Sequence, residues 1–249
     1  MTGTKQPALI LLHGATCNGR MWDAMRRGLD PQFQVLSPDL PGHGARRHET
    51  FTLQGAIDTV TAQAMSLDGA PLILVGDSLG GYTALASAAS VPAAQLKGLV
   101  LGGSSSNLTG LALLPYLLRS TLFKVLLALR DEQKLIRSLA PKLVSQVGMR
   151  QEDVDSMVSA GMSLRVFAQA VKALRDIDFR SKLAEVQPPV LFLNGEKDRG
   201  HMRQEASFLA VARDACAHHF PNCEHGVTIR RSSECAALIN AFASKVFAA

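Results

Sequence analysis

Short apolar runs alternate with helical patterns along most of this 249-residue chain. Five of the runs lack a strict apolar–polar alternation, which is typical of strands covered on both faces of a sheet. They lie at residues 8–12, 33–37, 72–75, 96–101 and 190–193, and a weaker sixth run lies at 218–220. Helical patterns occur at residues 21–29, 53–67, 79–89, 201–213 and 233–247. The alternation predicts an α/β fold with a doubly wound, mostly parallel sheet of about six strands.

The alternation is interrupted once, between residues 104 and 184. This region contains no convincing strand, and its Leu- and Ala-rich helical patterns lie at residues 111–129, 132–147, 152–161 and 164–174. We therefore expect residues 1–103 and 185–249 to form the core and residues 104–184 to form a helical cap or lid. Residues 108–118 are more apolar than a surface helix requires, which fits packing on the core or the lining of an apolar pocket. Such a cap could also supply the face of a homodimer.

Charge and composition indicate which kinds of binding partner to expect. The formal net charge is +5, and residues 104–184 hold twelve Lys and Arg against seven Asp and Glu, a difference of five that equals the whole excess. No basic run or aromatic interleaving accompanies it, so we expect no nucleic-acid partner. A solvated helical surface explains the excess, and a bias toward anionic substrates is the alternative. The longest uncharged run, residues 98–118, is interrupted by polar residues 102–107, which argues against a membrane span.

The N-terminus lacks an apolar segment typical of a secretory signal, and the four cysteines form no CxxC pair. We therefore expect a cytoplasmic protein with reduced cysteines. Cys223, Glu224 and His225, with two histidines nearby, match no familiar spacing of zinc ligands. We expect no metal and no cofactor.

The strongest chemical signal is Gly76-Asp77-Ser78-Leu79-Gly80, which directly follows the apolar run at 72–75. A strand that ends in Gly-x-Ser-x-Gly and continues as a helix must turn sharply, so that the serine side chain is pushed out above the sheet. A Cβ at either glycine would clash in so tight a turn. The pattern predicts that Ser78 is an exposed nucleophile.

A serine nucleophile needs a base and an acid that orients the base. In an open α/β sheet these groups gather at the carboxyl ends of strands. The strand at 190–193 is followed by a loop that contains Glu196 and Asp198, and we prefer Asp198 as the acid while Glu196 remains the alternative. His225 lies in a loop between the last strand and the C-terminal helix, which makes it the best base.

The remaining histidines fit other roles. We expect His13 and His43 to support loops, His48 and His201 to lie on surface segments, and His218 and His219 to lie in or beside the last strand. The oxyanion that forms on an attacked carbonyl needs preorganised donors. Two backbone N–H groups are suitably placed for it, those of Ala15 after the first strand and Leu79 after the nucleophile.

With these residues the chain resembles the α/β-hydrolase superfamily along nearly its whole length. The matching segments are residues 11–14, 39–44, 76–81, 194–198 and 225–226. The order Ser78, Asp198, His225 is also that of the superfamily. The resemblance implies a helical cap and a pocket between cap and sheet. The first strand begins near Ala8, which leaves no room for the superfamily's N-terminal strand hairpin.

The leading hypothesis is a serine hydrolase that cleaves a carboxylic ester of a small to medium, largely apolar acyl substrate through an acyl-enzyme. The alternative is hydrolysis of a carbon–carbon bond in a dienoate-type acid, whose carboxylate Arg150, Arg165 or Arg175 could contact. Asp77 weakens that alternative, because the resemblance implies Asn there in carbon–carbon hydrolases. More distant alternatives are a cofactor-free haloperoxidase or perhydrolase, a lyase, a thioesterase and a binding protein that lost turnover.

Overall fold

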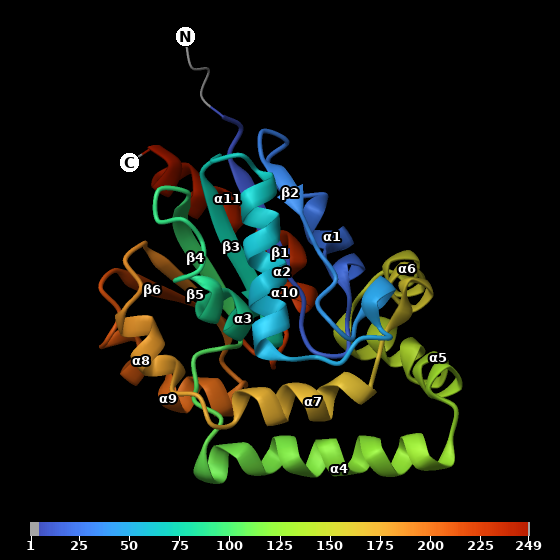
Figure 1. Cartoon of the computed structure of the whole chain (residues 1–249). Coiled ribbons are helices and arrows are strands. Elements are labelled where there is room, and N and C mark those ends of the chain that lie inside the picture. Colours follow the sequence, from blue (N-terminus) through green and yellow to red (C-terminus); the bar gives the residue numbers. More distant parts are fainter. Residues whose placement is uncertain (1–4, 249) are drawn as a thin grey trace.

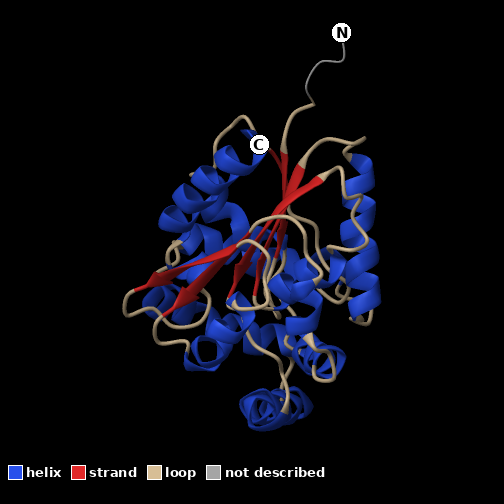
Figure 2. Ribbon diagram, turned by 90° about the vertical axis from the view of Figure 1, so that its left-hand side faces the viewer, coloured by secondary structure: helices blue, strands red, loops and turns tan. Residues whose placement is uncertain are grey.

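The computed structural model describes residues 5–248, which form one six-stranded, fully parallel sheet (Figures 1 and 2). The strands are β1 (Ala8–Leu12), β2 (Gln34–Leu36), β3 (Leu72–Asp77), β4 (Leu96–Gly102), β5 (Val190–Gly195) and β6 (Ala215–Phe220). Their order across the sheet is β2-β1-β3-β4-β5-β6. The predicted α/β fold with a parallel sheet of about six strands is confirmed.

Helices cover both faces of the sheet, because neighbouring side chains of each central strand point to opposite faces. In β1, Ile10 and Leu12 belong to one apolar cluster and Leu9 and Leu11 to the other, and all four are fully buried. The first face is covered by α2 (Leu53–Ser66), α3 (Leu79–Ser87), α8 (Phe179–Ala184) and α9 (Arg199–Leu209). The second is covered by α1 (Asp23–Arg26), α10 (Val227–Arg230) and α11 (Ser232–Ala248). This two-faced burial explains why the central strands have continuous apolar sequences.

The chain between β4 and β5 is helical. It contains a 3₁₀ turn at Gly110–Leu113, α4 (Leu114–Leu129), α5 (Glu132–Lys142), a π-helical turn at Leu143–Val147, α6 (Gln151–Gly161), α7 (Arg165–Leu174) and α8. Helices α4 and α7 lie side by side below the carboxyl ends of the strands in Figure 1. Phe123 and Phe167 join them in an edge-to-face contact with ring centroids 5.4 Å apart.

Element boundaries differ from the sequence pattern in informative ways. Strands β3 and β5 continue two residues beyond the apolar runs, through Asp77 and Gly195, because backbone pairing with β4 and β6 continues there. The pattern at 21–29 forms a 3₁₀ turn, Gly19–Trp22, followed by only one turn of α-helix. Helix α8 was not predicted. It begins at the residue after Asp178, whose side chain accepts a hydrogen bond from the Ser181 backbone N–H.

Candidate active site

Ser78 occupies the sharp turn between β3 and α3. Its φ of 52° and ψ of −113° are unusual for a residue with a side chain. The turn is tight on both sides, since a Cβ on Gly76 would run into the backbone of Gly80 and a Cβ on Gly80 into that of Leu12. The Ser78 N–H donates to the Gly102 carbonyl at the end of β4 at 2.7 Å. The backbone is thereby fixed in a conformation that leaves the Ser78 side chain half-buried at the carboxyl edge of the sheet.

Asp198 and His225 meet at the same edge from the loops that follow β5 and β6. His225 Nδ1 donates to Asp198 Oδ2 at 2.6 Å. Glu196, the other candidate acid, is exposed, and its Oε2 accepts from the Asn222 backbone N–H at 3.2 Å. The structure therefore brings Asp198, and not Glu196, to His225.

Consecutive glycines at the end of β4 link Ser78 to His225. Gly102 accepts the hydrogen bond from Ser78, while a Cβ on Gly103 would lie 2.8 Å from His225 Cε1. Gly103 has a φ of +54°, which also favours glycine. Its N–H is fixed by the Leu193 carbonyl at 3.1 Å and by Asn194 Oδ1 at 3.2 Å. The His225 ring therefore packs against a backbone segment that holds the Ser78 turn.

His201 is a component of this site that the sequence did not reveal. We expected it on a surface segment, which is wrong: it is 1% exposed, in the first turn of α9. Its Nδ1 donates to Asp198 Oδ1 at 2.9 Å, and its ring stacks on that of His225 with centroids 5.0 Å apart. Its Nε2 lies 3.3 Å from the Tyr82 hydroxyl. The spacing Asp198-x-x-His201 at the start of a helix is the signal that could have identified this contact, since residues three apart share a helix face.

The two histidines and the aspartate perturb one another's titration. Burial raises the pKa of Asp198, but hydrogen bonds from His201 and His225 outweigh it and hold that pKa well below its ordinary range. Burial acts to lower the pKa of His225, and the hydrogen bond and charge of Asp198 raise it above the ordinary value. The pKa of His201 is lowered, because burial dominates there. The site therefore holds an anionic Asp198 between a neutral, buried His201 and a more basic His225.

Asp77 is buried directly before Ser78. Its Oδ1 accepts from the Thr228 hydroxyl at 2.6 Å, and burial raises its pKa. The charge of Asp77 also acts on His225, whose pKa it raises. Asp77 therefore has two roles. Its charge acts on His225, and its hydrogen bond with Thr228 connects the end of β3 to α10.

Leu79 directly follows Ser78, and the residue before Ala15 lies close to Ser78 in space. Leu79 is the first residue of α3, and a Cβ on Gly14, next to Ala15, would lie 3.8 Å from Ser78 Cβ. Within residues 5–248 neither amide donates a hydrogen bond. We therefore keep both N–H groups as candidate donors to an oxyanion formed at Ser78.

His13 and His43 support loops, as expected. His13 Nε2 accepts from the Leu40 N–H at 3.1 Å, and His43 Nδ1 donates to the Pro41 carbonyl at 3.0 Å. The two rings are in contact, with centroids 4.6 Å apart, and both are fully buried. Burial lowers the pKa of each, so these histidines are neutral scaffold groups.

Helix α4 places Tyr116 and Arg119 within electrostatic range of the site. Burial and the negative charge of Asp198 raise the pKa of Tyr116 to about 12, and Arg119 acts to lower the pKa of His225. The three arginines suggested for a substrate carboxylate are exposed, and each pairs with an acid. The pairs are Arg150–Glu152, Arg165–Glu132 and Arg175–Asp176.

Asp198, His201 and His225 also have potential metal-ligand atoms within 4.8 Å of one another. Both Nδ1 atoms already donate to the Asp198 carboxylate. A metal ion would have to displace these hydrogen bonds, so the arrangement fits an acid–base pair better than a metal centre.

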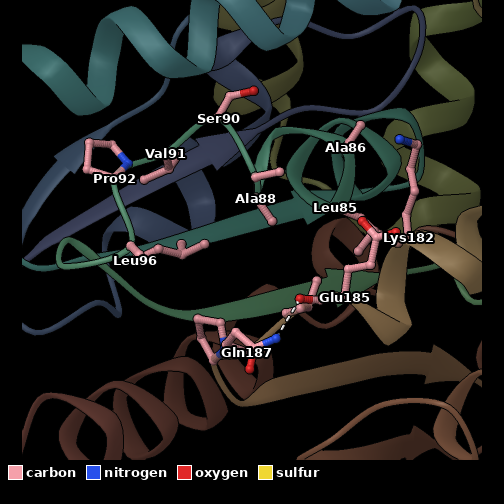
Figure 3. Close-up of a pocket in the computed structure, with 14 residues that line it drawn as sticks. Leu85, Ala86, Ala88, Ser90, Val91, Pro92, Leu96, Lys182, Glu185 and Gln187 are labelled. Carbon is pink, nitrogen blue, oxygen red and sulfur yellow. Dashed lines mark hydrogen bonds between the residues drawn. The ribbon is translucent and has the colours of Figure 1, made fainter.

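A hollow of about 450 Å³ lies elsewhere, between the end of α3, the start of β4 and the segment after α8 (Figure 3). Leu96, the first residue of β4, and Pro188, which comes shortly before β5, line it. These are the amino ends of the strands, opposite the edge that carries Ser78. The hollow is therefore separate from the candidate site.

A serine in a strained strand-to-helix turn, at the same carboxyl edge of a parallel sheet as an Asp–His pair, is typical of a hydrolase of the α/β class. The family model of the alpha/beta hydrolase family matches residues 9–238, and the chain belongs to this family of enzymes. A pimeloyl-[acyl-carrier protein] methyl ester esterase of Aromatoleum aromaticum is 28% identical over 257 residues, covering 94% of this chain and 97% of the relative.

Solved structures agree on the fold. A carboxylesterase of the thaumarchaeon Nitrososphaera gargenis superposes with a TM-score of 0.78 at 20% identity, covering 99% of this chain and 93% of that chain. A bromoperoxidase of Bacillus anthracis also superposes with a TM-score of 0.78, at 17% identity, covering 97% and 93%. One fold thus carries different reactions, so the reaction must be argued from the site.

Proposed function

We propose that the protein is a serine esterase that cleaves a carboxylic ester of a small to medium, largely apolar acyl substrate. The observation that carries this proposal is the 2.6 Å hydrogen bond between His225 and Asp198, beside the strained turn of Ser78. The esterase relative supports the ester as the bond that is cleaved. The substrate in that relative's name makes a methyl ester of a carrier-bound acyl chain the first natural substrate to test.

In the proposed reaction Ser78 Oγ attacks the ester carbonyl carbon while His225 Nε2 takes the hydroxyl proton. The carbonyl oxygen becomes an oxyanion that accepts hydrogen bonds from the Ala15 and Leu79 amides. The tetrahedral intermediate collapses, the carbon–oxygen bond to the alcohol breaks, and His225 returns the proton to the leaving alkoxide. Asp198 orients His225 and stabilises its charged form.

The acyl-enzyme is then hydrolysed by the reverse pattern. His225 takes a proton from water, the resulting hydroxide attacks the acyl carbon, and the carboxylic acid leaves as Ser78 Oγ regains the proton. One ester and one water give one acid and one alcohol, and no cofactor is consumed.

The carbon–carbon alternative has less support. Asp77 carries a buried carboxylate beside the nucleophile, and the arginines considered for a dienoate carboxylate are each paired with an acid. Comparison of kcat/KM for a simple aliphatic ester and for a vinylogous diketo acid separates the two reactions.

The decisive test is ester turnover by Ser78→Ala. We expect loss of p-nitrophenyl ester hydrolysis by a factor on the order of 10³ to 10⁶. An organophosphonate should label the unmodified protein at Ser78, and the variant should remain unlabelled. Turnover close to that of the unmodified protein, in a preparation free of other esterases, would falsify the assignment.

A further inference from the structure

The outer face of α4 carries an unusually exposed set of large apolar side chains. Six Leu and Val residues share it, each at least half exposed. They are Leu111 (90%), Leu114 (50%), Leu118 (64%), Leu122 (54%), Val125 (51%) and Leu129 (75%). The helix Gly110–Leu129 is long and apolar enough to cross a membrane, yet only 6% of its most apolar window is buried in the protein. Contiguous exposed apolar surface of this kind marks an interaction site.

These six residues, which we call the α4 stripe, form one straight band. Successive residues of an α-helix are rotated by about 100°, which places the five that belong to α4 within an arc of about 80°. Leu111 lies in the 3₁₀ turn directly before the helix. The opposite side of α4 contacts the protein, through the buried Ser120 and through Phe123, which packs on Phe167. The helix thus has an inner face that packs on α7 and an outer face whose large apolar side chains are half exposed or more.

The charges on α4 itself are all positive, and the first acid after the helix is the exposed Asp131. Residues 104–130 contain no Asp or Glu, and their three cations are Arg119, Lys124 and Arg130. On a helical wheel these lie roughly 100–120° from the centre of the stripe, Arg119 and Arg130 on one side and Lys124 on the other. The Arg119 guanidinium lies over the Phe167 ring of α7, 5.8 Å from its centroid, so Lys124 and Arg130 are the cations that the docking uses. The neighbouring α7 adds an exposed Lys172. An apolar band with flanking cations is the pattern of a helix that lies in the plane of an anionic lipid surface.

Two other arrangements fit less well. A transmembrane orientation would place Arg119 and Lys124 within the hydrocarbon, at a cost of about 2.5–3.5 kcal/mol each, and would detach α4 from α7. Pairing of two α4 stripes in a homodimer would surround the interface with cations from both copies. No acidic side chain of residues 104–130 could neutralise them. Phospholipid phosphates supply the missing negative charge.

We propose that α4 docks the protein on an anionic membrane surface, with the α4 stripe inserted among the acyl chains and the flanking cations at the phosphates. Since Tyr116 and Arg119 of the same helix are within electrostatic range of Asp198 and His225, docking places the candidate site next to the bilayer. An apolar substrate dissolved in the membrane could then reach the site without crossing water. This docking requires only the cap and holds whatever bond the site cleaves.

The test is co-sedimentation of the full chain with vesicles of phosphatidylcholine, with and without about one third phosphatidylglycerol. We expect binding to the phosphatidylglycerol vesicles that falls as salt is raised. The triple variant Leu118→Gln, Leu122→Gln, Val125→Gln should lower the partition coefficient about tenfold or more, because Gln keeps helix propensity and removes apolar area. Lys124→Gln with Arg130→Gln should weaken binding to the anionic vesicles only.

Met65→Gln is the matched control. Met65 is 64% exposed, like Leu118, but lies on α2, away from the cap. It should bind vesicles like the unmodified protein. Turnover of a water-soluble ester by every variant reports that the fold is intact.

Three outcomes would overturn the proposal. The first is absence of vesicle binding by the unmodified protein, and the second is equal binding by the triple variant. The third is that the stripe contacts a protein instead of a membrane. In that case the unmodified protein would form a stable dimer, or a complex with an acidic acyl carrier protein, that the triple variant abolishes, and it would not bind vesicles. Analytical ultracentrifugation with and without the carrier protein distinguishes the dimer from the complex with the carrier protein.

Discussion

His201 donates a hydrogen bond to Asp198 on the oxygen that His225 leaves free. The Nδ1–Oδ1 distance is 2.9 Å, and the His225 bond occupies Oδ2 at 2.6 Å. Because the carboxylate is held at both oxygens, its plane is fixed relative to the His225 ring. His201 itself is held from the other side by the Tyr82 hydroxyl, 3.3 Å from Nε2. We interpret His201 as a positioning residue that acts on the base through Asp198.

His201→Phe should keep the stacked ring and remove both hydrogen bonds. The base must be neutral to accept a proton, so kcat/KM falls as pH drops through the pKa of His225, which is raised above the ordinary value of about 6.5. Without the His201 donor the charge of Asp198 is less compensated and favours protonated His225 more strongly. The acidic limb of the pH–rate profile should therefore move to higher pH, with kcat lower by about tenfold.

Tyr82→Phe is the control for this variant, because it leaves the bond from His201 to Asp198 intact. The acidic limb of its pH–rate profile should stay at the same pH as in the unmodified protein. If His201→Phe lowers kcat at every pH without displacing the limb, the residue has only a packing role and our interpretation is wrong.

Asp77→Asn should move the same limb in the opposite direction. The charge of Asp77 raises the pKa of His225, and an amide removes that charge while its oxygen still accepts from Thr228. His225 should then lose its proton at lower pH, so that the pH–rate profile begins to rise earlier. Measurement of kcat/KM between about pH 5 and 9 is sufficient. A limb that is unchanged, or displaced upward, contradicts the electrostatic role of Asp77.

Gly103→Ala should lower activity more than the strain at a positive φ alone would explain. The new Cβ would lie 2.8 Å from His225 Cε1, and Gly103 also has a φ of +54°. Gly110 has the same φ, but a Cβ added there would have no atom within 4 Å, so Gly110→Ala reports strain alone. We expect both variants to lose roughly 1–2 kcal/mol of stability, while only Gly103→Ala loses about 100-fold in kcat/KM. Equal activities would show that His225 moves aside without consequence.

The central strands could be predicted closely because they are buried on both faces, whereas the edge strand β6 is partly exposed and was predicted only at its end. A run such as residues 8–12 is apolar at every position, and the strand has these same bounds. The predicted strand ends were less accurate where backbone pairing continues beyond the apolar run, as it does through Gly195. The turn of Ser78 could be predicted because two glycines and a serine have a steric reason to occur at that spacing.

The contacts around Asp198 were harder to predict because they depend on three dimensions. His201 has no apolar neighbour pattern that marks it as buried, and its burial arises when the start of α9 packs beside the ring of His225 and the hydroxyl of Tyr82. The exposure of the α4 stripe could not be predicted from the sequence for a related reason. The sequence shows that residues 111–129 are apolar, but only the placement of α4 on α7 shows which face is covered.

Arg27 anchors the cap to the core through a buried acid, and its loss should loosen the cap. Its two terminal nitrogens donate to Asp153 of α6 at 2.8 and 2.6 Å, and Asp153 is 3% exposed. Arg27→Met leaves that carboxylate buried without its partner, which costs about 3–5 kcal/mol in a fully buried pair. The Arg27 side chain is 42% exposed, so water can reach the site and the loss should be smaller, roughly 1–3 kcal/mol. Urea denaturation of Arg27→Met, Asp153→Asn and the double variant measures the coupling, and additive losses would show that the pair does not hold α6 in place.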